Sequence, residues 1–183
     1  MRRNIILVPL VRISSQIVEI LEQSLAGIFG SGIHVRMRIG SLDYAYAPKR
    51  KQYLAPLILS SLRSLTAGVR CLGIVNVDLY SPGLNYILGE ADIGSGVALI
   101  SLYRLRPQVY GLPPDEKLYH NRIIKEAVHE LGHTYYLNHC LDGKCVMHFS
   151  RGLADTDLKQ VGFCQKCQKK LDEAGPNGDA ATA

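Results

Sequence analysis

The sequence lacks any apolar run long enough to cross a membrane, since no stretch approaches about 20 consecutive apolar residues. The apolar segment at residues 4–11 is short, contains Pro9 and is followed by Arg12. A secretory signal would need a longer apolar core and a small-residue cleavage site. We therefore expect a protein that has no membrane partner and works in the cytoplasm.

The sequence also lacks a large excess of positive or negative charge. The formal net charge is +5, and the densest basic cluster is only Lys49, Arg50 and Lys51. A nucleic-acid-binding protein more often carries a longer basic stripe with interleaved aromatic residues. We interpret the cluster as part of a solvated loop, and we expect no nucleic-acid partner.

The first two thirds of the sequence alternate between strand-like and helical apolar patterns. The predicted strands are residues 4–11, 34–39, 71–79, 85–88 and 97–105, and the predicted helices are residues 13–29, 53–65 and 115–135. Such alternation is typical of an α/β (α+β) fold, in which helices back a twisted mixed sheet. Residues 85–88 are too close to their neighbours for a helical crossover, so we expect an antiparallel edge strand there.

The last quarter has little strand pattern. Asp155 or Thr156 could cap a final helix that runs toward Leu171, and residues 174–183 have the composition of a disordered tail. The chain length suits one domain with a small appended subdomain. We expect a monomer with an N-terminal subdomain at 1–138, a C-terminal subdomain at 139–173 and a tail.

One predicted helix contains the motif His129-Glu130-Leu131-Gly132-His133. Residues four apart lie on the same face of a helix, so His129 and His133 can hold one zinc ion. Glu130 is next in sequence and can reach a water molecule on that ion. The alternative is a helix that carries two histidines by chance, which the adjacent glutamate makes a weak interpretation.

A third histidine, His139, follows His133 by six residues. A continued helix would rotate by about 600° over six residues and point His139 away from the ion. The helix must therefore end between the two histidines if His139 binds. Three protein ligands leave a fourth position for water, which is typical of catalytic zinc.

This arrangement predicts hydrolysis of an amide or peptide bond. Zinc lowers the pKa of its bound water from about 15.7 to about 7. Glu130 would act as the general base, taking the proton from that water and later delivering it to the leaving amine. Zinc would polarise the scissile carbonyl and stabilise the developing oxyanion.

Four of the five cysteines lie in the last quarter, at Cys140, Cys145, Cys164 and Cys167. Clustered cysteines in a reducing compartment favour metal over disulfides. Two pairs separated by a loop predict a tetrahedral four-thiolate structural zinc site, against the alternatives of free cysteines or a redox pair. We therefore expect two zinc ions per chain, one catalytic and one structural.

The combined motif resembles that of the archaemetzincins, a branch of the metzincin zinc peptidases. It reads His129-Glu130-x-x-His133-(x)5-His139-Cys140-(x)4-Cys145-x-Met147, followed by Cys164-x-x-Cys167. Upstream segments that also resemble the family are Val77-Asp78-Leu79-Tyr80, Asn85, Gly89-Glu90-Ala91 and Ser101-Leu102-Tyr103-Arg104-Leu105. The resemblance extends from the first strand to about Leu171.

The resemblance implies a metzincin-like fold and the same assignment of the metal ligands and of Glu130. It also implies that Met147 lies in a Met-turn, a loop that forms an apolar floor beneath the catalytic zinc. The antiparallel edge strand would line the substrate cleft and pair with an extended peptide by strand addition. The residues of that strand would be Asn85, Tyr86, Ile87, Leu88 and Gly89.

Two positions depart from the usual metzincin pattern. Tyr136 occupies the place of a glycine whose left-handed conformation breaks the helix, so either Tyr136 is strained or Asn138 makes the turn instead. Phe149 stands two residues after Met147, where some metzincins have a tyrosine that assists the reaction. His148 could donate a proton in its place, although a lone histidine is more often a plain loop residue.

Three functions are compatible with these sequence features. The leading interpretation is a zinc-dependent peptidase, and the first alternative is a catalytically silent metzincin-fold zinc protein that binds peptides or protein partners. Tyr136 and Phe149 favour that alternative. The second alternative is a zinc-ribbon-like nucleic-acid module built on the cysteines, which the scattered basic residues disfavour.

Overall fold

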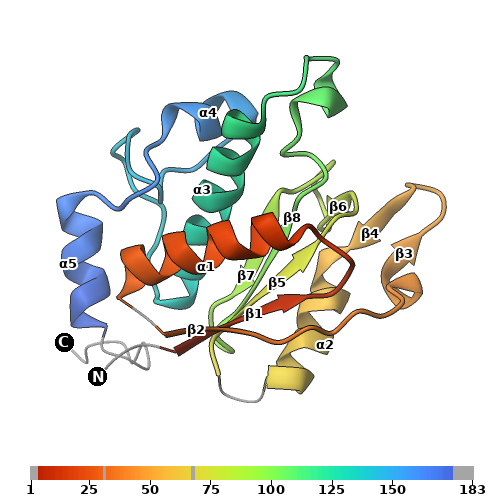
Figure 1. The fold of residues 1–183 in the computed structure, drawn as a ribbon, viewed down its shortest axis with the longest axis horizontal. Helices are drawn as coiled ribbons and strands as arrows, with labels where there is room; N and C mark the ends of the chain where they lie inside the picture. The colour runs from red at the N-terminus through yellow and green to blue at the C-terminus, as the bar shows by residue number, and fades with distance from the viewer. Residues whose placement is uncertain (1–3, 31, 67–68, 175–183) are drawn as a thin grey trace.

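The computed structural model describes residues 4–30, 32–66 and 69–174. A five-stranded sheet in the order β2-β1-β5-β8-β7 forms its centre (Figure 1). The strands are β1 (Asn4–Pro9), β2 (Gly32–Val35), β5 (Cys71–Val75), β7 (Gly89–Asp92) and β8 (Val97–Ser101). β1 pairs in parallel with β2 and β5, and β5 with β8, whereas β7 runs antiparallel to β8. This confirms a mixed sheet with an antiparallel edge strand.

Three long helices cover the two faces of this sheet, as Figure 1 shows. They are α1 (Ser15–Phe29), α2 (Ala55–Thr66) and α3 (Glu116–Thr134). Alternate residues of the central strands point to opposite faces: Leu72 and Ile74 join one apolar core with α1 and α3, while Cys71 and Val75 join another with α2. Since both faces are covered, β5 and β8 are buried along their whole length, as parallel strands usually are.

The edge strand begins later than predicted. Of residues 85–88, only Ile87 makes an isolated antiparallel bridge, with Leu79, and β7 itself starts at Gly89. The Leu88 carbonyl nevertheless accepts a hydrogen bond from Ser101 N (2.8 Å). Residues 84–88 are therefore an irregular segment that leads into the edge strand.

Several other predicted boundaries are wrong. The strand predicted at 34–39 is regular only to Val35, because Pro9 has no N–H to donate back and the pairing continues one-sidedly through Arg36 N to Leu7 O. The strand predicted at 97–105 stops at Ser101, whose hydroxyl accepts a hydrogen bond from Tyr103 N in a local turn. A polar side chain thus replaces the next ladder partner.

A second, three-stranded sheet was not predicted. It contains β3 (Tyr46–Ala47), β4 (Gln52–Leu54) and β6 (Leu79–Tyr80) in the order β3-β4-β6. Its pairing of Tyr53 with Leu79 delays the start of α2 and interrupts the strand predicted at 71–79. The loop expected at Lys49, Arg50 and Lys51 is a turn over residues 48–51 that joins β3 to β4. Two short 3₁₀ helices, η1 (Asp43–Ala45) and η2 (Pro107–Tyr110), complete the N-terminal part.

The final helix predicted toward Leu171 is two helices, α4 (Leu153–Leu158) and α5 (Gln165–Glu173). They are separate because the connecting segment pairs with the preceding loop, through Gln160 N to Lys144 O and Val146 N to Gly162 O. Ala174, predicted to begin the tail, is buried at the end of α5. The rest of the predicted tail, 175–183, lies outside the described residues. No helix in the described part of the chain is long and apolar enough to cross a membrane.

Candidate active site and structural metal site

α3 positions three of the predicted site residues on its C-terminal half. Its first turn is capped by Asp115, whose carboxylate accepts a hydrogen bond from Leu118 N (2.8 Å). The helical repeat then places His129 and His133 on one face, with their ring centroids 4.7 Å apart.

The hydrogen bonds of these two imidazoles define their tautomers. His129 Nδ1 lies 2.8 Å from the Val146 carbonyl, and His133 Nδ1 lies 2.7 Å from the Leu137 carbonyl. A carbonyl only accepts, so both Nδ1 atoms must carry the proton and donate it. The two Nε2 atoms therefore face each other with lone pairs at 3.2 Å. This arrangement of donors fits a metal cation between them.

The helix ends as the third ligand requires. Tyr136 adopts φ 62°, and the Leu137 amide donates back to the Gly132 carbonyl (3.2 Å), which is the 6→1 bond of a Schellman turn. Apart from glycine, only Lys51 and Tyr136 have positive φ among the described residues. The break predicted before His139 is thus present, and it is made at Tyr136 rather than at the alternative, Asn138.

This turn brings His139 to the other two histidines. Its ring centroid lies 5.4 Å from that of His129 and 4.9 Å from that of His133. One ligand atom from each of the three residues falls within 4.8 Å of the others. Burial lowers the pKa of all three imidazoles, that of His129 well below its ordinary value. They are therefore neutral at neutral pH, the form that binds zinc.

Glu130 lies in the same cavity. The cavity has a volume of about 520 Å³, and the three histidines and Glu130 line it. Glu130 is only 6% exposed. Burial, reinforced by the neighbouring carboxylate of Glu126, raises its pKa well above the ordinary value. A carboxylate with raised basicity beside a metal site is suited to accept a proton.

The walls of the cavity come from two segments. One wall contains all five residues predicted for the cleft edge, from Asn85 to Gly89, together with Leu84. A second part of the lining follows Met147 in sequence and includes Phe149 and residues 150–152. The Phe149 ring packs edge-on against His139, with 4.9 Å between centroids. Both segments therefore line the cavity that contains the histidines.

Met147 and His148 have distinct structural roles. Met147 is fully buried, and a Cβ at Gly132 would collide with its sulfur, so Met147 packs directly against α3 at the turn that contains Gly132 and His133. His148 Nδ1 lies 2.9 Å from the Cys140 carbonyl and donates to it. His148 is thus a loop residue that holds Cys140 in place.

Sequence reasoning missed two buried charged residues of the cavity, Glu126 and Lys159. Glu126 is one helical turn before Glu130, so the i, i+4 spacing could have placed it on the same face. Lys159 is 3% exposed and donates to the His148 carbonyl (3.2 Å). Burial lowers its pKa, while the carboxylates of Glu126 and Glu130 oppose this shift. No local pattern signals Lys159, because the loop after α4 carries it back to the site.

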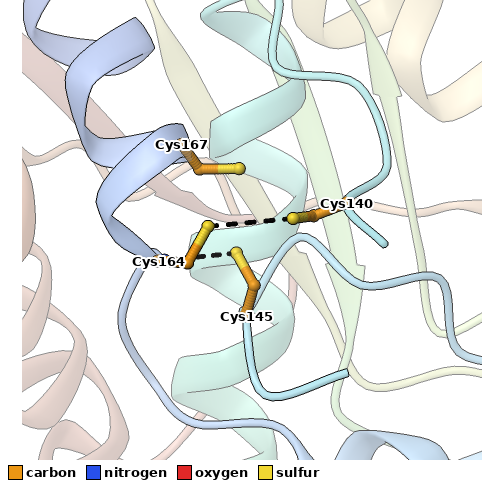
Figure 2. A group of neighbouring side chains, drawn as sticks. All are labelled: Cys140, Cys145, Cys164 and Cys167. Atoms are coloured by element: carbon orange, nitrogen blue, oxygen red, sulfur yellow. Dashed lines mark hydrogen bonds between the residues drawn. The ribbon is translucent and has the colours of Figure 1, made fainter. Parts of the chain in front are cut away.

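The four cysteines of the last quarter converge on one point, as Figure 2 shows. Cys164 and Cys167 come from the start of α5, and Cys140 and Cys145 from the loop after α3. Cys140 Sγ and Cys164 Sγ are 3.8 Å apart, which equals the edge of about 3.8 Å of a tetrahedron with 2.3 Å zinc–sulfur bonds.

The electrostatics of this cluster also fit a metal. Burial raises the pKa of the Cys145 and Cys167 thiols, whereas a backbone hydrogen bond lowers that of Cys164. Four close thiolates need a cation to neutralise their charge. The cysteine cluster is therefore suited to a closed, structural zinc site. The fifth cysteine, Cys71, is buried in β5.

Comparisons with known proteins agree with this geometry. The profile of peptidase family M54 matches residues 15–173. The archaemetzincin of Pyrococcus abyssi is 44% identical over 177 residues, which cover 92% of this chain and 94% of that protein.

Solved structures show the same similarity. The crystal structure of archaemetzincin from Methanopyrus kandleri has a TM-score of 0.82 at 37% identity and covers 94% of both chains. A zinc-dependent peptidase from Methanocorpusculum labreanum has a TM-score of 0.85 at 27% identity, covering 91% of this chain and 99% of its own. With the family profile and the identities over nearly the full length, these likenesses show that the chain belongs to peptidase family M54, the archaemetzincin family of zinc metallopeptidases.

Proposed function

We propose that the chain hydrolyses peptide bonds with Glu130 as the general base and with His129, His133 and His139 as the ligands of the catalytic zinc. The observation that carries this proposal is the placement of a buried, basic carboxylate in the same cavity as three neutral imidazoles. The Glu130 side chain follows His129 in sequence, so the first turn of the motif presents both groups to one point.

Each residue then has a defined task. A bound zinc ion supplies a Lewis acid that acidifies a water molecule and polarises the scissile carbonyl. Glu130 takes the proton of the attacking water and gives it to the leaving amine. Val146 and Leu137 fix the two helix histidines through their Nδ1 atoms, so the free Nε2 atoms keep their orientation. Met147 supports α3 from below.

The substrate would bind in extended form along the segment from Asn85 to Gly89. This segment lines the cavity and leads into β7, which has β8 on one side only within the described sheet. An open strand edge offers backbone N–H and C=O groups to a peptide, which is the basis of strand addition. The irregular stretch before Gly89 supplies side chains to the same wall.

The proposal also includes a second zinc on Cys140, Cys145, Cys164 and Cys167, giving two zinc ions per chain. It retains a monomer located in the cytoplasm, since a reducing compartment keeps clustered thiols available for metal. It further retains the division into subdomains 1–138 and 139–173.

The test compares zinc-loaded wild type with Glu130→Gln and, as a matched control on the same helix, Glu116→Gln, whose carboxylate is exposed. Hydrolysis of a peptide mixture should fall about 10²–10⁴-fold in Glu130→Gln and stay near wild type in Glu116→Gln. Equal rates in all three proteins would contradict the role of Glu130. A zinc-loaded wild type that binds peptides without cleaving them would favour the silent alternative.

A further inference from the structure

Arg50 belongs to the basic cluster interpreted from the sequence as a solvated loop, yet it makes specific contacts. Its Nη2 atom donates to the carbonyls of Leu84 (3.0 Å) and Asn85 (2.9 Å). Its Nε atom donates to Gln52 Oε1 (3.0 Å), and its guanidinium lies 4.3 Å from the centre of the Tyr80 ring. Arg50 is therefore oriented by two neighbours and reaches a segment more than thirty residues away in the chain.

Gln52 reinforces the same contact. It is 7% exposed, and its Nε2 atom donates to the Asn85 carbonyl (2.9 Å). That carbonyl thus accepts from both Gln52 and Arg50, one of which is a charge-assisted donor. Buried polar groups that are satisfied in this way resist displacement.

The hairpin between β3 and β4 is built to present these two side chains. Lys51, between them, adopts the left-handed conformation with φ 55°, and its amide donates to the Ala47 carbonyl (2.9 Å). β4 is anchored to β6 through the pairing of Tyr53 with Leu79. The hairpin is therefore a fixed support on the outer side of the cavity wall.

A second arginine holds the next residue of this wall. The Arg104 guanidinium lies 4.2 Å from the centre of the Tyr86 ring. Arg104 is itself fixed by two hydrogen bonds to the Asp78 carboxylate, at 2.6 and 2.7 Å. The Ile87 amide then donates to the Leu79 carbonyl (3.0 Å). Contacts with neighbouring segments thus hold each residue from Leu84 to Ile87.

We propose that Arg50 and Gln52 are positioning residues that hold the cleft rim, residues 84–88, in the conformation that receives an extended peptide. The rim has no regular strand of its own, so side-chain contacts replace ladder hydrogen bonds. Because Asn85 O already accepts two hydrogen bonds, a bound peptide pairs with backbone groups from Tyr86 onward. This inference rests on the proposed binding of extended substrates along the rim.

A direct consequence concerns substrate length. Peptides long enough to extend along the rim depend on its order, whereas peptides that occupy only the positions next to the scissile bond do not. Loss of the Arg50 and Gln52 contacts should therefore raise KM for long peptides and leave kcat unchanged, since the carbonyls of Val146 and Leu137 hold His129 and His133 independently of the rim.

The test uses the zinc-loaded full chain as wild type, Arg50→Ala and Arg50→Lys, with Lys49→Ala as the control for loss of a neighbouring positive charge. Hydrogen exchange of the backbone amides at 84–89 is measured first, without substrate. We expect about tenfold faster exchange in Arg50→Ala, because the rim loses its anchor. Arg50→Lys should restore little, since an ammonium lacks the planar fork of guanidinium. Lys49→Ala should match wild type.

Kinetics on short and long peptides follow with the same proteins. KM for the long peptide should rise about tenfold in Arg50→Ala, and KM for the short one should stay constant. Exchange at 84–89 equal to wild type would overturn the inference, whether or not the protein cleaves peptides. Faster exchange with no change in the KM of long peptides would overturn it too. A wild type without activity would instead count against the proposed function. The exchange measurement would still show whether Arg50 orders the rim.

Discussion

At the scale of single residues, the turn after α3 is the least expected feature of the site. Tyr136 occupies the left-handed region although a side chain there costs about 1–2 kcal/mol. Its neighbours offset this cost, because Leu137 is buried, donates to Gly132 O and accepts from His133 Nδ1. One strained residue therefore allows three favourable contacts and brings His139 to His129 and His133.

Replacing Tyr136 with glycine should stabilise the protein. Tyr136 is 48% exposed, so little packing is lost, and glycine adopts φ 62° without steric cost. We expect a gain of about 0.5–1 kcal/mol in the free energy of unfolding, after the entropy that glycine adds to the unfolded chain. Urea unfolding of the zinc-loaded protein measures it. Asn138→Gly is the control, since Asn138 has no positive φ and should lose stability. A Tyr136→Gly protein less stable than wild type would contradict the proposed backbone strain at Tyr136.

Residue types and spacing predict the metal ligands but not the groups that hold them. His129 and His133 follow from helical periodicity, and the four cysteines follow from their pairing in sequence. Arg50 was interpreted as solvated because its partners, the carbonyls of Leu84 and Asn85, carry no side-chain signature. Lys159 was missed because only the fold returns it to the cavity. Contacts to the backbone of distant segments leave no pattern in the sequence.

At the scale of secondary structure elements, α3 and the Met147 turn are packed without free space. A Cβ on Gly132 would overlap Met147 Sδ and lie 3.3 Å from the Phe163 ring. Gly132 sits between the two helix histidines, so any shift of Met147 or of the helix changes the metal site. Glycine is required at this position by close approach and not by its backbone angles.

Gly132→Ala should destabilise the protein by about 1–3 kcal/mol, the usual cost of overpacking a dense core. It should also weaken zinc binding by the histidines, because Val146, next to Met147, holds His129. Gly27→Ala is the matched control, since its Cβ would meet nothing within 4 Å in α1. That change should stabilise by about 0.5–1 kcal/mol, the helix propensity of alanine over glycine. Thermal unfolding of both variants decides between packing and propensity, and equal shifts would contradict the packing argument.

Helices and strands were predictable where the apolar periodicity extends over many residues. Their predicted boundaries were wrong where pairing with distant segments competed with the local pattern. α1 and α3 match their predicted ranges closely, because apolar spacing continues over several turns. The edge strand is at Gly89–Asp92 and not at 85–88, because its register is set by pairing with β8. Tyr53, predicted to be helical, pairs with Leu79 in the second sheet. These choices depend on partners distant in sequence.

At the scale of the whole molecule, the elements that carry the three histidines and the four cysteines share one core. Met147, Cys145, Cys167 and Leu171 belong to the same apolar cluster as α1 and α3. The Cys140 amide donates to the Met147 carbonyl (2.9 Å), and His148 donates to the Cys140 carbonyl. The segment between α3 and α4 that carries Cys140 and Cys145 is therefore folded back on itself, and it also contacts His129 through Val146.

This coupling predicts that damage to the cysteine site weakens the histidine site. Cys164→Ser removes a ligand that is remote from the three histidines in sequence, yet it loosens the loop that presents His139. We expect about a tenfold loss of zinc affinity at the histidine site, in the range usual for residues that support metal ligands. Competition with a fluorescent zinc chelator separates the two affinities. Cys71→Ala, in β5 and outside the cluster, is the control and should leave both unchanged. Unaltered histidine-site affinity in Cys164→Ser would show that the two sites are independent, and then the contacts of Leu137 alone would have to offset the left-handed conformation of Tyr136.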